Sequence, residues 1–121
     1  MAGDILAPRA LDDRFPGLKR YATTAYATSG VILAAPGVLF QVRGFSSRKS
    51  AQWVQILDAA AVPADTSVPI HIIRVGPNEN FFLDLGEFGD DFATGICWST
   101  SSTGPTKTIG SADTWVSAGY N

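Results

Sequence analysis

The sequence has very few of the side chains that usually carry chemistry or cross-link a fold. Its 121 residues include one cysteine and one histidine. One cysteine cannot form a disulfide within the chain, and no Cys and His spacing is typical of a zinc site. Cys97, in TGICWST, is therefore predicted to be a small buried residue on a strand. Neither a metal nor a cofactor is predicted.

Charged residues are also scarce, at 17% of the chain, and the formal net charge is −2. Such a chain has no basic field for DNA, so nucleic-acid binding is disfavoured. The hydrophobic fraction of 45% is enough for one folded domain. No stretch approaches the roughly 18 apolar residues of a membrane span, and the first 15 residues lack the apolar run of a signal peptide. We expect a soluble protein, made in a cytoplasm, with no membrane partner.

An amphipathic helical period is missing as well. The best candidate for a helix follows Leu57, in QILDAAAVPADTSVP (residues 55–69). Pro63 bars a helix interior three residues beyond Ala60, and Pro69 bounds the far side. We interpret the stretch as a strand end that runs into a connection.

Strand signals, in contrast, recur from Ala22 to the C-terminus. In VLFQVRGF (38–45) the side chains alternate between two predicted faces, with Val38, Phe40 and Val42 on one and Leu39, Gln41 and Arg43 on the other. Further strands are predicted at residues 52–57, 68–75, 81–85, 92–100 and 114–120. Seven or eight short strands without crossover helices predict an all-β fold, an antiparallel β-sandwich (jelly-roll-like) or a small barrel.

The N-terminal segment differs from the rest in charge. Residues 1–20 hold seven of the twenty charged residues (nine Lys and Arg plus eleven Asp and Glu) and show no clear period. We predict an extended arm at residues 1–25, ordered by a partner, before a single β-sandwich domain at residues 26–121; a disordered terminus is the alternative. The arm residues expected to contact the partner are Arg9, Arg14, Phe15, Lys19, Arg20 and Tyr21.

Five carboxylates lie between residues 79 and 91. Oxygen-rich loops bind calcium, and paired carboxylates cleave glycosides. However, GEFGDD (86–91) lacks the ligand spacing of a calcium loop, and Asp84, between two leucines, is expected to point to solvent. A solvated acidic rim is the favoured interpretation. The group comprises Glu79, Asp84, Glu87, Asp90 and Asp91.

Other patterns also have structural explanations. The tryptophans Trp53, Trp98 and Trp115 could form a sugar-stacking platform, but each lies in an apolar strand, so packing in the core or a subunit interface is favoured. His71 lies between isoleucines, with no assignable nucleophile or orienting acid, and is predicted to be structural. The segment STSSTGPTKT lacks a G-x-S-x-G context and is predicted to be a surface loop. No enzyme activity is predicted.

A small basic loop is predicted in VRGFSSRKS. It carries Arg43, Arg48 and Lys49. These side chains could contact an acidic partner or keep a sheet edge soluble, and both roles stay open here.

Two segments carry a family resemblance. QILDAAAVPADTSVPI is a strand ending in Asp-Ala before a proline-flanked loop, and FATGICWSTSSTGPT is a strand before a polar loop. With the other features of residues 37–121, they resemble small β-sandwich structural proteins of tailed bacteriophages. Such proteins are capsid decoration (cement) proteins or virion knobs and fibre heads.

The resemblance implies a virion structural protein, first of all a cement protein that bridges capsid subunits and stabilises the head. The implied partners are the major capsid protein and further copies of the chain, most directly as a homotrimer whose arm reaches onto the shell. The implied location is the capsid surface of the virion, after assembly in the host cytoplasm. The alternative is a carbohydrate-binding module on a virion fibre, knob or tail. No catalytic residues follow from the resemblance.

Overall fold

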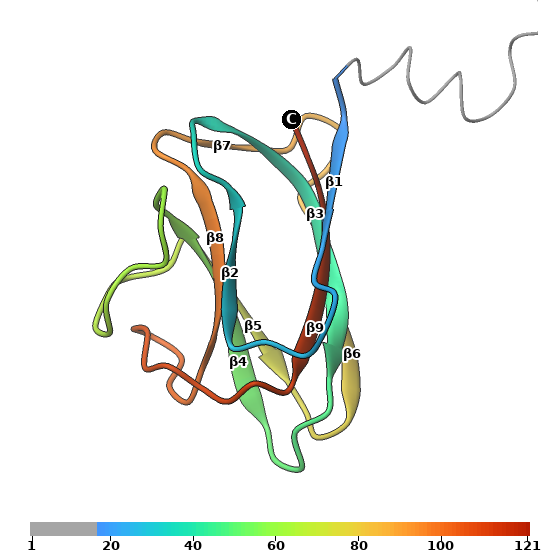
Figure 1. Ribbon diagram of the computed structural model, residues 1–121, viewed down its shortest axis with the longest axis vertical. Helices are drawn as coiled ribbons and strands as arrows, with labels where there is room; N and C mark the ends of the chain where they lie inside the picture. Colours follow the sequence, from blue (N-terminus) through green and yellow to red (C-terminus); the bar gives the residue numbers. More distant parts are fainter. Residues whose placement is uncertain (1–16) are drawn as a thin grey trace, which may run out of the picture.

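The computed structural model describes residues 17–121, which form two antiparallel sheets packed face to face (Figure 1). Sheet A has the strand order β1-β9-β3-β6, with β7 also paired to β3, and sheet B has the order β2-β8-β4-β5. No helix forms in this part of the chain. The predicted all-β antiparallel sandwich is confirmed. The strands are β1 Lys19–Ala22, β2 Ser29–Leu33, β3 Gly37–Ser46, β4 Gln52–Asp58, β5 His71–Val75, β6 Glu79–Asp84, β7 Asp90–Phe92, β8 Ile96–Ser101 and β9 Thr114–Tyr120.

The core lies between the two sheets and is built from alternate residues of the long strands. Burying each of its large apolar side chains contributes roughly 1.5–3 kcal/mol relative to exposure. The side chains that are completely inaccessible to solvent come from both sheets: Leu39, Val42, Val54, Ile56, Val75, Ile96, Trp98 and Val116.

One side of the sandwich is joined by a hydrogen bond between the sheets. The indole Nε1–H of Trp98 in β8 donates to the hydroxyl of Tyr21 in β1, at 3.1 Å. Gly30 in β2 leaves room for this contact, because a Cβ there would lie 2.3 Å from the Tyr21 hydroxyl. The bond therefore fixes edge strand β1 to the centre of sheet B.

The predicted faces of residues 38–45 are wrong in the first half of the strand. Leu39 and Val42 are both completely buried, although three positions separate them. The pairing of β3 with β9 shifts register between Leu39 and Gln41. This irregularity reverses the alternation, since one extra residue moves the following side chains to the opposite face.

The predicted single strand at residues 92–100 is also wrong. β7 pairs with β3 in sheet A, whereas β8 lies between β2 and β4 in sheet B. The chain crosses between the sheets at residues 93–95. There the Asp58 carboxylate accepts hydrogen bonds from the backbone N–H groups of Ala93 (3.2 Å), Thr94 (2.9 Å) and Gly95 (3.3 Å).

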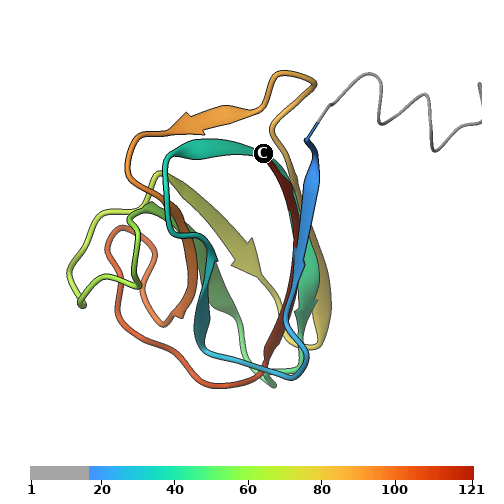
Figure 2. The same cartoon turned by 45° about the horizontal axis from the view of Figure 1, so that its top comes forward.

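The connection after β4 agrees with the sequence interpretation. β4 ends at Asp58, and residues 59–70 contain no helix. This segment forms a long loop that lies against sheet B (Figure 2). The stretch DAAAVPADTS is thus a strand end followed by a connection.

The expected boundary of the N-terminal arm needs correction. Residues 19–22 form β1, which pairs along the end of β9 in sheet A. The sandwich therefore begins before residue 26, and three of the expected contact residues, Lys19, Arg20 and Tyr21, belong to a sheet edge. The other three, Arg9, Arg14 and Phe15, lie outside the described residues.

Candidate interaction surface

The outer face of sheet B is covered by two loops, residues 59–70 and 102–113, which lie side by side in Figures 1 and 2. Their backbones pair where the N–H of Thr66 donates to Lys107 O (2.7 Å) and the N–H of Lys107 donates to Ser67 O (2.8 Å). The buried Lys107 ammonium also lies 2.8 Å from Asp65 Oδ1. This contact holds the pKa of the Asp65 carboxyl below its ordinary value.

Beneath these loops, Gln55 of β4 is completely buried. Its side-chain amide donates to the carbonyl oxygens of Thr103 (3.1 Å), Gly104 (2.8 Å) and Thr106 (3.2 Å). The predicted polar loop therefore covers the sheet, and its first three residues, 99–101, are buried strand rather than surface.

Cys97 lies on the same covered face and is completely buried, which confirms the sequence prediction. Its thiol contacts Ala59 O at 3.1 Å. Burial raises the pKa of the Cys97 thiol, so the unreactive protonated form is favoured.

The outer face of sheet A has no such covering loop in the described part of the chain (Figures 1 and 2). Neighbouring residues of β3 and β9 form rows across it: Phe45 beside Trp115, Arg43 beside Ser117, and Gln41 beside Gly119. Side chains in one row lie about 5 Å apart, and successive rows are about 7 Å apart. This open face is one candidate for an interaction surface.

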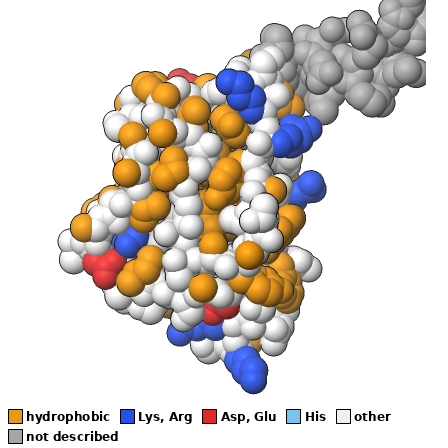
Figure 3. Space-filling model, in the orientation of Figure 1, with side chains coloured by type: hydrophobic (Ala, Val, Ile, Leu, Met, Phe, Trp, Pro, Cys, Tyr) orange, Lys and Arg blue, Asp and Glu red, His pale blue; other side chains and the backbone are white. Residues whose placement is uncertain are grey.

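At one end of this face, four residues line a hollow of ≈440 Å³, here called the aromatic hollow: Ala25, Tyr26, Phe45 and Trp115. Tyr26 is 52% exposed and Trp115 is 38% exposed. Figure 3 shows hydrophobic side chains gathered at the lower right of the molecule, with Lys and Arg side chains above them along the same side.

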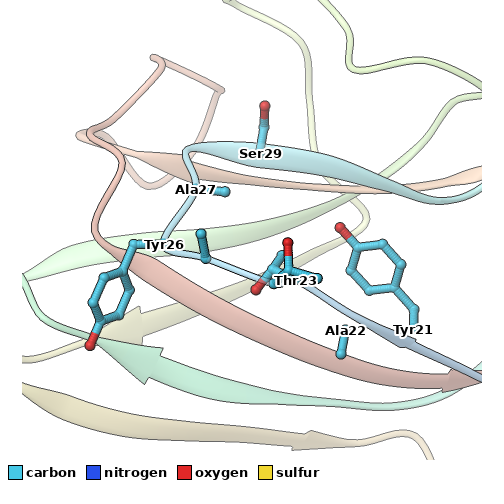
Figure 4. A pocket seen from close by; sticks show the side chains of 8 residues that line it. Tyr21, Ala22, Thr23, Tyr26, Ala27 and Ser29 are labelled. Atoms are coloured by element: carbon cyan, nitrogen blue, oxygen red, sulfur yellow. The ribbon is translucent and has the colours of Figure 1, made fainter.

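A second hollow of ≈340 Å³ adjoins the aromatic hollow and is lined by residues 21–27 and Ser29. Ala25 and Tyr26, in the segment between β1 and β2, line both hollows. In Figure 4, Tyr21 and Tyr26 extend from opposite ends of this segment, and Thr23 lies between them. The Thr23 hydroxyl accepts a hydrogen bond from the N–H of Val116, which ties the segment to β9.

The structure separates the three tryptophans that the sequence analysis grouped. Trp98 points into the core, Trp53 is half-buried against Gly104 of the covering loop, and Trp115 lies on the open face of sheet A. The three tryptophans therefore do not form one platform, and the favoured core packing is confirmed for Trp98. The rings that do accompany Trp115 are Phe45 and Tyr26, which the sequence analysis did not single out.

Two arginines flank the small residues of β9 on the open face. Arg43 is exposed beside Ser117 in the pairing of β3 with β9, so it belongs to a strand and not to the predicted basic loop. The guanidinium of Arg20 lies over Gly119, 3.9 Å from where a Cβ would stand. Neither arginine makes an ion pair or a side-chain hydrogen bond with another described residue.

A separate apolar surface lies on edge strand β5 and the residues before it. Val68 is 74% exposed, Ile70 is 52% exposed and Ile72 is 46% exposed. We call these three residues the β5 surface. Exposed apolar edge strands favour association with other chains.

His71 meets a carboxylate that the sequence analysis did not assign to it. Its Nε2 lies 2.7 Å from Asp90 Oδ2 of β7, and the ring packs near Phe92, with centroids 6.4 Å apart. This contact ties β5 to β7 across the two sheets. No serine, threonine or cysteine in residues 17–121 makes a hydrogen bond with His71, so the described structure offers it no nucleophile.

The acidic residues make separate local contacts. Glu79 accepts a hydrogen bond from the N–H of Gly76 (3.0 Å), and the exposed Asp84 accepts one from the N–H of Gly86 (2.9 Å). Within the described residues, no three His, Cys, Asp or Glu side chains converge to hold a metal ion. The described chain also contains no helix long and apolar enough to cross a membrane.

Comparisons with known proteins return one distant structural likeness. No protein-family model matches the chain, and no curated protein sequence matches it. The coat protein of tobacco streak virus superposes with a TM-score of 0.43 at 11% sequence identity, over 86% of this chain and 88% of the coat protein. Values this low establish neither a common family nor a common role.

Proposed function

We propose that the chain is a virion structural protein, and first of all a capsid decoration protein. It would associate with itself as a homotrimer, bind the major capsid protein and stabilise the head from its outer surface. The observation that carries this proposal is the β5 surface, an exposed apolar strip on an unpaired sheet edge. Burying such a strip between copies would supply a hydrophobic contact for assembly.

The N-terminal segment is the proposed attachment to the shell. In the sequence it precedes β1, which begins at Lys19 on one edge of sheet A. We expect a variant lacking residues 1–16 to keep the sandwich and lose binding to capsids. Removal of residues 1–20 would be a poorer test, because it also deletes half of β1.

The decisive experiment is the copy number of this chain in purified virions, measured by quantitative mass spectrometry against the major capsid protein. A ratio near one to one supports the decoration role. A few copies per particle would place the chain in a neck, tail or fibre, and its absence from virions would overturn the structural role.

Self-association is tested separately by light scattering coupled to size-exclusion chromatography. Replacing Ile70 and Ile72 with serine is expected to shift the trimer to monomer. A matched control replaces Val31, which is 36% exposed on β2, with serine and is expected to leave the trimer intact.

A second candidate function is carbohydrate binding on a virion fibre, knob or tail. The exposed ring of Trp115 in the aromatic hollow favours it, because a flat aromatic face can stack against the apolar face of a sugar ring. Glycan-array binding that is lost in Trp115→Ala supports this function, whereas retained binding would place the glycan elsewhere.

A further inference from the structure

We propose that the outer face of sheet A binds an anionic oligosaccharide, with one sugar ring on Trp115 and a carboxylate of the glycan near Arg43 and Arg20. This inference rests on the carbohydrate-binding function above and not on the decoration role. It names the ligand class, acidic glycans that contain uronic or sialic acids.

Along β9 the outward residues are Trp115, Ser117 and Gly119, so a large aromatic ring is followed by two small residues. The distance from Trp115 to Gly119 is about 14 Å along the strand. Gln41 of β3 and Arg20 of β1 lie over the buried Gly119, so polar side chains close the end of the row that begins at Trp115.

Trp115, Phe45 and Tyr26 surround the aromatic hollow, whose ≈440 Å³ lies within the usual range of small-molecule sites. Trp115 and Tyr26 are partly exposed without a ligand, so their rings are available for contact. A pyranose ring has an apolar face that matches an indole, and hydroxyl groups at its edge that remain in water or contact polar neighbours.

Arg43 lies one row from Trp115, and Arg20 lies over Gly119 at the next row. Neither guanidinium has a carboxylate partner among residues 17–121. Guanidinium groups bind carboxylates through paired hydrogen bonds, so an acidic sugar attached to the stacked one would find its complement here.

Ser117 and Gln41 lie in the same two rows as the arginines and offer a hydroxyl and an amide. Both are only half-buried, so a ligand can reach them. Alternating stacking and hydrogen-bonding groups suit a sugar chain, whereas a nucleic acid would meet only two cations on this face of a chain whose net charge is −2.

The test is a glycan array that carries uronic-acid and sialic-acid oligosaccharides beside the same glycans with esterified carboxylates. We expect the full chain to bind acidic glycans, and to bind the esterified forms about tenfold more weakly or worse. Trp115→Ala and Arg43→Gln are each expected to weaken binding about tenfold, with Trp115→Phe retaining part of it. The matched control is Arg74→Gln, which removes an equally exposed arginine from β5 in sheet B.

Each of the remaining outcomes would overturn the proposal. Equal binding of acidic and esterified glycans overturns the anionic ligand and leaves carbohydrate binding intact. Binding to no glycan overturns both. Preferential binding of a single-stranded oligothymidylate would assign the face to nucleic acid instead. Loss of the oligomer in Trp115→Ala would assign it to a second copy of the chain.

Discussion

The two sheets of this sandwich use the same strand geometry but have different outer faces. In sheet B, two loops cover β4 and β8, and the outward residues beneath them, Gln55, Cys97, Ser99 and Ser101, are all buried. In sheet A, the equivalent face leaves Trp115, Phe82 and Arg43 exposed. Substitutions on the covered face should therefore lower stability, and substitutions on the open face should change binding instead.

The tryptophans give the largest expected difference. Trp98→Ala should lower the free energy of unfolding by about 3–5 kcal/mol, since it opens a cavity between the sheets. Trp115→Ala should lower it by about 1 kcal/mol or less, because the ring is already partly in water. Urea unfolding followed by circular dichroism measures both, and Trp98→Phe serves if the alanine variant does not fold. Equal losses of unfolding free energy in Trp98→Ala and Trp115→Ala would contradict this difference between the core and the open face.

Gln55 on the outer face of sheet B and Gln41 on the outer face of sheet A form a matched pair with a smaller expected effect on stability. Gln55→Ala removes the donor to three loop carbonyls and should cost about 2 kcal/mol of unfolding free energy. Gln41→Ala, on the open face, should stay within about 0.5 kcal/mol of the parent. The same unfolding measurement applies, and a Gln41 loss as large as that of Gln55 would show that both faces contribute to stability.

Acid should weaken the covered side of the molecule. The pKa of Asp58 is lowered mainly by the Thr94 N–H, and the pKa of Asp65 is lowered mainly by Lys107. Because the folded-state pKa values lie below the ordinary 3.8, this stabilisation is present above that pH and is lost as the pH falls through the folded-state values.

The measurement is the melting temperature as a function of pH. Asp58→Asn and Asp65→Asn should each lower the melting temperature at neutral pH and make its fall in acid shallower. Asp91→Asn, at an exposed position of β7, is the control and should follow the parent. A parallel fall in all variants would show that other groups control acid unfolding.

The smallest expected effect on stability is at the arginines of the open face. Arg20→Gln and Arg43→Gln should each stay within about 0.5 kcal/mol of the parent in urea unfolding, because neither guanidinium has an ion-pair partner in the described structure. A larger loss would mean that these side chains serve the fold rather than a ligand.

The sequence predicted the class of fold well and the surfaces poorly. Proline at positions 63 and 69 excluded a helix there, and the strands predicted at residues 52–57 and 81–85 correspond to β4 and β6. Alternation failed at Leu39, where a register shift reverses the faces, and at residues 93–95, where the chain changes sheets. Both failures reflect pairing with distant strands, which a local pattern does not contain.

The candidate site was predictable only in part. Trp115 was singled out as an aromatic that could stack on a sugar, and Arg43 as a basic group that could contact a partner. Phe45, two positions after Arg43, follows from the same alternation and could have been placed on that face. Tyr26 could not, because it lies in a connection with no periodic pattern.

The sequence alone determined that this chain forms short antiparallel strands with a buried apolar face, because strand period and turn residues act over a few neighbouring positions. Only the tertiary structure decided which outer face is covered and which is open. That outcome depends on contacts such as Gln55 with Thr103, which join residues 48 positions apart. Alternation assigns side chains to one of two faces, but it does not specify what lies against them.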